Sequence, residues 1–186
     1  MQKTTTLAKL KLFARRALAY EIDIFILFTG ILLTQGLLYL LNANPIVRLM
    51  VSGQAFTGGQ LHLWVLATVS WPLWFYYALL HSSKWQATLG QRLMKLHVTT
   101  TDGGRLAFGP AFVRAIVMLI PFEVNHAVMF HLGNFGPEAS APTPAFWMGY
   151  TAVWLLIVAY IVAALVTPRQ QSLHDFVVGT IVTSKP

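Results

Sequence analysis

Four long apolar segments constrain this chain more than any other feature of its sequence. They occupy residues 17–41, 61–80, 111–132 and 146–167. At a rise of about 1.5 Å per residue, each helix can cross a hydrocarbon core about 30 Å thick. Apolar residues make up 56% of the sequence and charged residues 10%, a ratio that a soluble domain of this size does not need. The sequence predicts an all-α polytopic membrane protein with four transmembrane helices in one domain, residues 1–186.

Basic residues are concentrated on one side of this predicted bundle. They comprise Lys3, Lys9, Lys11, Arg15 and Arg16 before the first helix, Lys84, Arg92, Lys95, Arg105 and Arg114 around the 81–110 loop, and Arg169 and Lys185 in the 168–186 tail. The 42–60 connection holds only Arg48. By the positive-inside rule we expect an N-in/C-in protein of the bacterial cytoplasmic (inner) membrane, whose basic residues face the anionic inner leaflet. Because these charges form short clusters instead of one stripe, nucleic acid is not an expected partner.

The predicted cytoplasmic loop, residues 81–110, has structure of its own. Residues 84–95 have the pattern of a short, basic amphipathic helix lying on the leaflet surface. Residues 96–108 carry β-branched side chains before an Asp-Gly-Gly turn, which is typical of a hairpin. A two-stranded hairpin alone is marginally stable, and residues 179–183 read as a further strand. We therefore expect a small cytoplasmic β-element between helices two and three, joined by the C-terminal strand.

The first apolar segment contains two carboxylates, Glu21 and Asp23. Asp23 lies two helical turns after Arg16 on the same face, about 10 Å away, and Ala19 between them lets another backbone approach. An aspartate inside a spanning helix costs about 2.5–3.5 kcal/mol on insertion scales, so Asp23 should hydrogen-bond a facing helix or bind a proton or cation. Glu21 lies about 200° around the helix from Asp23. It needs a separate explanation: contact with basic head groups or Arg114, or a role in transport.

A second polar cluster lies in the third apolar segment. Pro121 should kink the helix and free a backbone carbonyl. Glu123 and His126 share a face and could form a proton relay or a cation site. The alternative is that the helix breaks at Pro121, so that Glu123 lies in the outer interface. The chain has no cysteine, no metal-binding histidine spacing, no phosphate loop and no nucleophile elbow, so we expect no metal, no cofactor and no enzymatic activity.

Several motifs together resemble the RDD family of multi-pass membrane proteins. They are Arg16-x-x-Ala19-x-x-Ile22-Asp23; Trp85-x-x-Thr88-Leu89-Gly90-Gln91-Arg92-Leu93 followed by Asp102-Gly103-Gly104; Phe108-Gly109 and Arg114; and Arg169-Gln170-Gln171-Ser172-Leu173-His174-Asp175-x-x-x-Gly179-Thr180-x-Val182. The family is named for one arginine and two aspartates, which this resemblance places at Arg16, Asp23 and Asp175. It implies a membrane protein for which transport of small ligands or ions is suggested in some members.

Asp175 has two explanations. The stretch Ser172-Leu173-His174-Asp175 fits a capping box at the start of a short helix, a role that contributes about 1 kcal/mol. The resemblance adds an ion pair on the cytoplasmic face, and we expect Arg16 as the partner because it enters the membrane on the same side.

Two functions follow from these features. The favoured one is transport of a small ligand or ion with proton or cation coupling. It would involve a homo-oligomer or a partner membrane protein, since four helices leave little room for a gated path around Asp23. The alternative is a non-catalytic accessory or scaffold protein, whose polar residues lock the helices together and whose basic loop engages lipid or a partner complex.

Overall fold

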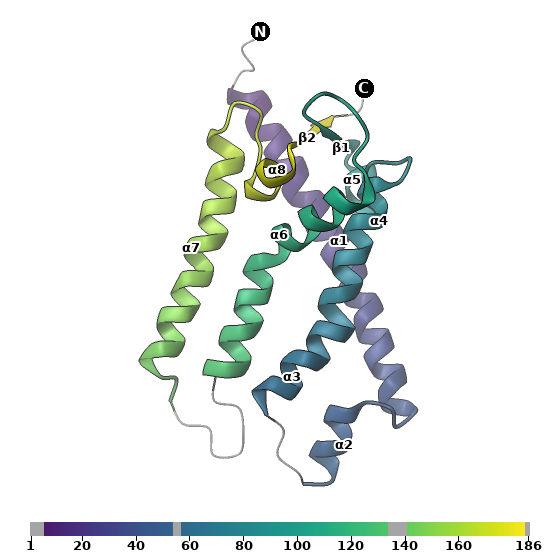
Figure 1. Cartoon of the computed structure of the whole chain (residues 1–186), viewed down its shortest axis with the longest axis vertical. Coiled ribbons are helices and arrows are strands. Elements are labelled where there is room, and N and C mark those ends of the chain that lie inside the picture. Colours follow the sequence, from purple (N-terminus) through teal and green to yellow (C-terminus); the bar gives the residue numbers. More distant parts are fainter. Residues whose placement is uncertain (1–5, 54–56, 134–140, 185–186) are drawn as a thin grey trace.

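The computed structural model describes residues 6–53, 57–133 and 141–184 and is mostly helical (Figure 1). Its elements are α1 (Thr6–Leu40), α2 (Pro45–Val51), α3 (Gly58–Val65), the π-helical turn η1 (Leu66–Ser70), α4 (Trp71–Ser82), α5 (Leu89–Leu93), β1 (Leu96–Thr100), α6 (Phe108–Ala127), the π-helical turn η2 (Val128–Leu132), α7 (Pro144–Val166), α8 (Leu173–Val178) and β2 (Thr180–Ser184). Four spans are long and apolar enough to cross a membrane: Thr6–Leu40, Gly58–Ser82, Phe108–Leu132 and Pro144–Val166. The predicted class is confirmed. Lys3 and Lys185, used above for orientation, lie outside the described residues.

Helix α1 begins eleven residues before the predicted start of the first span, so it is longer than a bilayer crossing requires. Contacts with distant parts of the chain hold these polar first turns. The Arg15 guanidinium donates to the Met94 carbonyl (Nε–O 2.9 Å), and the Gln170 amide donates to the Lys9 carbonyl (2.7 Å). An apolar pattern finds the span but cannot find this extension, because the extension is stabilised by tertiary contacts.

Helix α2 was not predicted. It begins at Pro45, and the side chain of the preceding Asn44 accepts hydrogen bonds from the backbone N–H groups of Ile46 and Val47 (3.1 and 3.2 Å). Asparagine followed by proline is a known helix start. The signal was present in the 42–60 connection, where we expected only a loop.

Helix α6 passes through Pro121 without breaking, so the predicted alternative of a break at this residue is wrong. Proline has no N–H to donate to the carbonyl four residues earlier, that of Val117. The Tyr160 hydroxyl on α7 donates to this carbonyl instead (2.5 Å). The bond satisfies the freed acceptor and fixes α7 against α6.

The β-element differs from the predicted hairpin. The turn forms, with Gly103 N–H bonded to the Thr100 carbonyl (2.9 Å), but the return strand expected at 105–108 is absent from the two-stranded sheet of the described residues. Leu106 is instead buried in the core, and α6 already begins at Phe108, which leaves no room for a strand. The C-terminal β2 pairs directly with β1, antiparallel, with Val98 opposite Val182. The predicted contribution of the tail is therefore confirmed, and its strand is the only partner of β1 in the described sheet.

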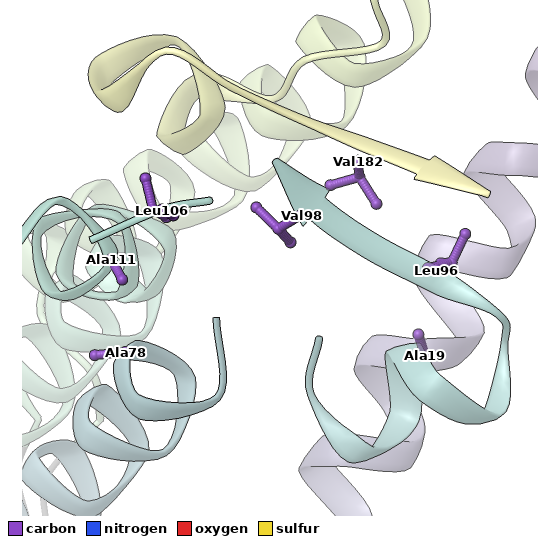
Figure 2. Close-up of a cluster of buried hydrophobic side chains, with 7 residues drawn as sticks. All are labelled: Ala19, Ala78, Leu96, Val98, Leu106, Ala111 and Val182. Atoms are coloured by element: carbon purple, nitrogen blue, oxygen red, sulfur yellow. The ribbon is translucent and has the colours of Figure 1, made fainter. Parts of the chain in front are cut away.

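The sheet closes one end of the helical bundle, the end at which α1 begins and β2 ends (Figure 1). Aliphatic side chains from five elements and from the loop before α6 meet beneath it in a buried cluster of Ala19, Ala78, Leu96, Val98, Leu106, Ala111 and Val182 (Figure 2). This cluster anchors the sheet to α1, α4 and α6. It thereby fixes the polar side chains that lie beside it.

The predicted amphipathic helix over residues 84–95 is reduced to the five-residue α5, so that prediction is wrong in extent. Thr88 and Gln91 form a capping box at its start. Gly90 packs so closely on α1 that a Cβ atom at this position would lie 2.1 Å from the Ala19 carbonyl oxygen. The close backbone approach expected at Ala19 is therefore confirmed, and the segment that approaches is α5.

Candidate functional site

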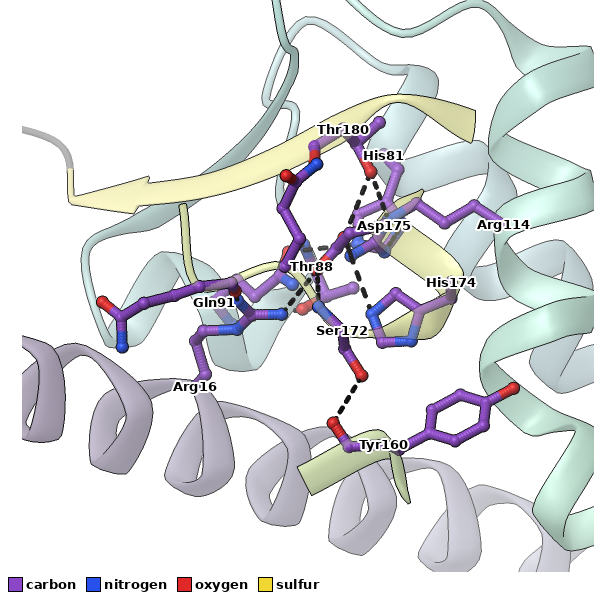
Figure 3. Close-up of polar contacts among 12 residues, drawn as sticks. Arg16, His81, Thr88, Gln91, Arg114, Tyr160, Ser172, His174, Asp175 and Thr180 are labelled. Atoms are coloured by element: carbon purple, nitrogen blue, oxygen red, sulfur yellow. Dashed lines mark hydrogen bonds and ion pairs between the residues drawn. The ribbon is translucent and has the colours of Figure 1, made fainter. Parts of the chain in front are cut away.

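Asp175 is the centre of a buried ion cluster at the end of the bundle that the sheet closes (Figure 3). Its Oδ2 accepts from Arg16 Nη2 (2.7 Å) and from the Ser172 backbone N–H (3.1 Å). Its Oδ1 accepts from Arg114 Nη2 (2.6 Å) and from the Thr180 hydroxyl (3.1 Å). Both predicted roles are present together: Asp175 caps α8 and pairs with Arg16. Two of the three positions named by the resemblance are thus in direct contact.

Arg114 is the residue that the sequence reasoning missed. The sequence analysis used it as a basic residue of the loop, as part of the family motif and as a possible partner of Glu21, but did not place it with Asp175. Its side chain is 1% exposed and lies between Asp175, Thr180 and His81. Arg16, by comparison, is 13% exposed. The sequence did hold a signal, because Arg114 is seven residues into an amphipathic apolar helix, where an arginine needs a buried partner.

His81 connects the ion cluster to α5. Arg114 Nη1 lies 3.2 Å from His81 Nδ1, and His81 Nε2 lies 3.1 Å from Gln91 Oε1. Since arginine can only donate, this geometry requires a neutral His81 with its proton on Nε2. Gln91 Oε1 also accepts the Thr88 backbone N–H that it caps (3.0 Å). A continuous chain of polar contacts therefore runs from Asp175 to the start of α5.

Asp23 ends this chain. Its carboxylate, 1% exposed, accepts three hydrogen bonds: from the Tyr76 hydroxyl (2.6 Å), the Thr88 hydroxyl (2.5 Å) and the Gly90 backbone N–H (2.8 Å). The expected bonding of Asp23 to neighbouring elements is confirmed, with α4 and α5 as the partners. Arg16, Asp23 and Asp175 thus belong to one set of contacts, which we call the polar network and which also contains Arg114, His81, Gln91 and Thr88.

Charge balance sets the protonation of the network outside the spanning helices. Burial raises the pKa of Asp175, but Arg114 and Arg16 outweigh it and hold that pKa well below its usual range. Burial lowers the pKa of the neighbouring His174 to about 3 against the attraction of Asp175. At neutral pH, Asp175 is therefore charged and His174 is not.

Glu21 lies outside the polar network. Its side chain is exposed, and among the described residues it forms no ion pair, with Arg114 or with any other group. The predicted contact with Arg114 is therefore wrong, because that guanidinium is occupied by Asp175 and His81.

The second polar cluster lies toward the opposite end of the bundle from Asp175. The Glu123 carboxylate and His126 Nδ1 are 3.7 Å apart, which is too long for a hydrogen bond. His126 stacks on Phe130, and His62 Nδ1 lies 3.0 Å from His131 Nε2. The predicted pairing of Glu123 with His126 is thus present as a loose contact. Within the described segments, no group of three or more histidine and carboxylate side chains could hold a metal ion.

A cavity of about 560 Å³ lies between α1, α6 and α7, with α8 at one end. Its wall is mainly apolar and aromatic. Four of the seven members of the polar network line it: Arg16, Asp23, Gln91 and Arg114. Glu21 and Asn125 add two further polar side chains. Residues Ser172 and His174 close the end next to α8.

Close packing at two places holds α7 beside this cavity. Toward one end, a Cβ atom at Gly149 would lie 2.8 Å from a methyl group of Val128, so only glycine lets α7 approach η2 this closely. Toward the other, the Ser172 hydroxyl donates to the Tyr160 carbonyl (2.9 Å), and Tyr160 bonds to Val117 as described above. The cavity lies between these fixed points.

Comparison with known proteins identifies the family. The sequence model of the RDD family matches residues 10–179. The chain belongs to the RDD family. No curated protein and no solved structure matches it. This RDD protein is thus a multi-pass membrane protein.

Proposed function

We propose that this RDD protein carries a small ligand across the bacterial cytoplasmic (inner) membrane, by way of the cavity between α1, α6 and α7. The observation that carries the proposal is the cavity itself. Its volume of about 560 Å³ falls in the range of small-molecule sites, about 300–1,000 Å³. Apolar walls with a few polar groups at one end suit a ligand that is largely apolar. We further propose the N-in/C-in orientation, which places the polar network at the cytoplasmic end.

An ion path through Asp23 is less well supported than a ligand path. A bound cation would require carboxylate oxygens that are free to coordinate it, and hydrogen-bond donors from Tyr76, Thr88 and Gly90 already surround both oxygens of Asp23. We therefore assign Asp23 to holding α5 on α1. Coupling to a proton or cation gradient remains part of the proposal, with Glu21 and the Glu123–His126 pair as the candidate groups.

The second candidate function is a non-catalytic accessory or scaffold protein, and one observation favours it. Arg16, Asp23 and Asp175 are all engaged in internal bonds, which is what a purely structural polar network requires. Exposed basic side chains near this end, including Lys84, Arg92 and Lys95, would then bind the anionic leaflet or a partner membrane protein. A homo-oligomer is compatible with either function.

Flux into proteoliposomes distinguishes the two functions. The panel comprises labelled tetraphenylphosphonium, a quaternary ammonium, palmitate, an uncharged quinone, Na⁺ and K⁺, each with and without imposed proton and sodium gradients. Two neighbouring α7 positions give a matched pair of variants, since Ile157 lines the cavity and Val158 is exposed outside it. We expect protein-dependent flux of at least one amphiphile, lost in Ile157→Trp and kept in Val158→Trp. Flux of no member above protein-free liposomes would contradict transport and favour the scaffold.

A further inference from the structure

Resting on the proposed function, the structure also indicates what the cavity binds. We infer that the ligand is a lipophilic organic cation, held by the Glu21 carboxylate and by the aromatic rings of the cavity wall. A ligand of this class combines a positive centre with large apolar groups. Three observations support the inference: the charge balance of the wall, its aromatic content and a buried hydroxyl without a partner.

The charge balance of the wall favours a cation. Arg16 and Arg114 line the cavity, but both guanidinium groups are bonded to the carboxylate of Asp175 behind them. Asp23 adds a second buried carboxylate to the network. Two formal positive charges are thus matched by two negative ones, and an anionic ligand would have to compete with Asp175 for its arginines.

Glu21 adds a third carboxylate that no cation balances. It lines the cavity, its side chain is exposed, and it takes part in no ion pair within the described residues. A carboxylate beside apolar walls attracts a positive group more strongly than it would in water, because the surroundings screen the charge less. The unbalanced charge of the cavity is therefore negative.

The aromatic content of the wall favours the same ligand class. Seven lining residues carry phenyl, phenol or indole rings: Phe13, Tyr20, Tyr77, Phe122, Tyr150, Trp154 and Tyr160. The faces of such rings attract cations, and cages of this kind bind quaternary ammonium groups. A small hydrated metal cation would lose its water shell against this wall with too few oxygen ligands to replace it. An organic cation, which is weakly hydrated, does not have this cost.

The Tyr77 hydroxyl points to an occupant. This residue lines the cavity and is 2% exposed, yet its hydroxyl has no hydrogen-bond partner among the described residues. A buried hydroxyl without a partner costs free energy, about 1–3 kcal/mol. A positive group in the cavity would be attracted by the lone pairs of the Tyr77 oxygen, which is a hydrogen-bond acceptor as well as a donor.

Binding of two probes with the same shape and opposite charge tests the inference. Tetraphenylphosphonium and tetraphenylborate are measured by equilibrium dialysis against the full chain in nanodiscs. We expect the cation to bind at least tenfold tighter than the borate. Glu21→Gln should weaken cation binding at least tenfold, and Glu21→Asp should restore part of it. The control Asp102→Asn removes an exposed carboxylate outside the cavity and should change binding less than twofold.

The aromatic wall has its own matched pair on α7. Trp154→Leu removes a lining indole, whereas Trp147→Leu removes an exposed indole that does not line the cavity. Only the first should weaken binding of tetraphenylphosphonium, by about threefold to tenfold if one cation–π contact is lost. Equal effects of the two changes would contradict the assignment of the rings.

Three results would overturn the inference, and they bear differently on the proposed function. Equal binding of both probes, abolished by Ile157→Trp, would show that the cavity binds a ligand without selecting its charge. The transport proposal would then be kept, and the inference of a cationic ligand would be rejected. Cation binding unchanged in Glu21→Gln, with melting temperature also unchanged, would remove Glu21 from the site. Absence of binding by both probes would overturn the ligand class, and the flux panel would then decide the function.

Discussion

Replacing Arg114 by methionine should destabilise the protein more than replacing any other arginine. Methionine keeps much of the length and apolar volume of the side chain but removes the charge and all donors. Arg114 is 1% exposed, and its loss leaves Asp175, Thr180 and His81 each without a bond that it now supplies. Breaking a buried ion pair on one side costs about 3–5 kcal/mol, and we expect a loss in this range.

Arg16→Met should cost less, about 1–2 kcal/mol. Arg16 is partly accessible, at 13% exposure, so water replaces some of its hydrogen bonds. Arg92→Met is the control, because Arg92 is exposed and stacks on Trp85 without an ion pair in the described part of the chain. Its change should stay near 0.5 kcal/mol, as for most surface substitutions. The predicted order of destabilisation is Arg114, Arg16, Arg92.

Equilibrium unfolding in mixed SDS and dodecyl maltoside micelles, followed by tryptophan fluorescence, gives these free energies. A double-mutant cycle of Arg114→Met with Asp175→Asn should show a coupling of about 2 kcal/mol or more, because the double mutant removes both charges of the most deeply buried pair and leaves only the partly accessible Arg16 without its carboxylate. Reversing Arg16 and Asp175 together would not restore stability, since it would place a new arginine against Arg114. An Arg16→Met loss as large as that of Arg114→Met, or a fully additive cycle, would refute the reasoning.

Three further predictions concern the network and its surroundings. Gly90→Ala should destabilise the protein by about 2 kcal/mol or more, because the new Cβ atom would collide with α1. The control Gly30→Ala on α1 should be neutral or stabilising, because a Cβ atom there meets nothing within 4 Å. Thermal melting in detergent compares the two variants. Asp23→Asn should cost about 1–2 kcal/mol in SDS unfolding, because the amide oxygen still accepts from the Gly90 N–H. Asp23→Leu should cost about 3 kcal/mol or more, because leucine leaves that buried N–H without a partner. Equal losses of stability in the two variants would mean that these hydrogen bonds matter little. At a pH between its folded pKa of about 3 and its ordinary pKa of 6.5, His174 binds a proton only when the chain unfolds, so the stability of the folded protein falls as pH falls. From pH 7 to pH 5, the wild type should therefore lose about 2 kcal/mol more stability than His174→Asn. Asp175 adds acid sensitivity only below pH 3.8.

Local sequence signals predicted the spans and several contacts. Long apolar runs gave the four helices, and the serine–aspartate spacing gave the cap of α8. The Arg16–Asp175 pair followed from two opposite charges on one side of the membrane, with the family resemblance to mark them. In each of these cases the physical cause lies in the nearby sequence or in charge alone.

Tertiary contacts decided what the sequence reasoning missed. Arg114 looked like one more basic residue of the loop, because its burial depends on α8 and β2 folding over it. The predicted hairpin failed because burial of Leu106 and the start of α6 take the residues that its second strand would need. The cavity could not be predicted from the sequence pattern of α7. It lies between Gly149 and Tyr160, where α7 packs against other elements of the fold.

Single-cysteine protection tests whether a ligand occupies the space between α1, α6 and α7. The chain has no cysteine, so Ile157→Cys and Val158→Cys each introduce a unique thiol, one lining the cavity and one outside it. Alkylation by N-ethylmaleimide is timed in proteoliposomes with and without saturating tetraphenylphosphonium. We expect the cation to slow labelling at position 157 at least fivefold and to leave labelling at position 158 unchanged. Equal labelling rates at position 157 with and without the cation would contradict the proposed binding.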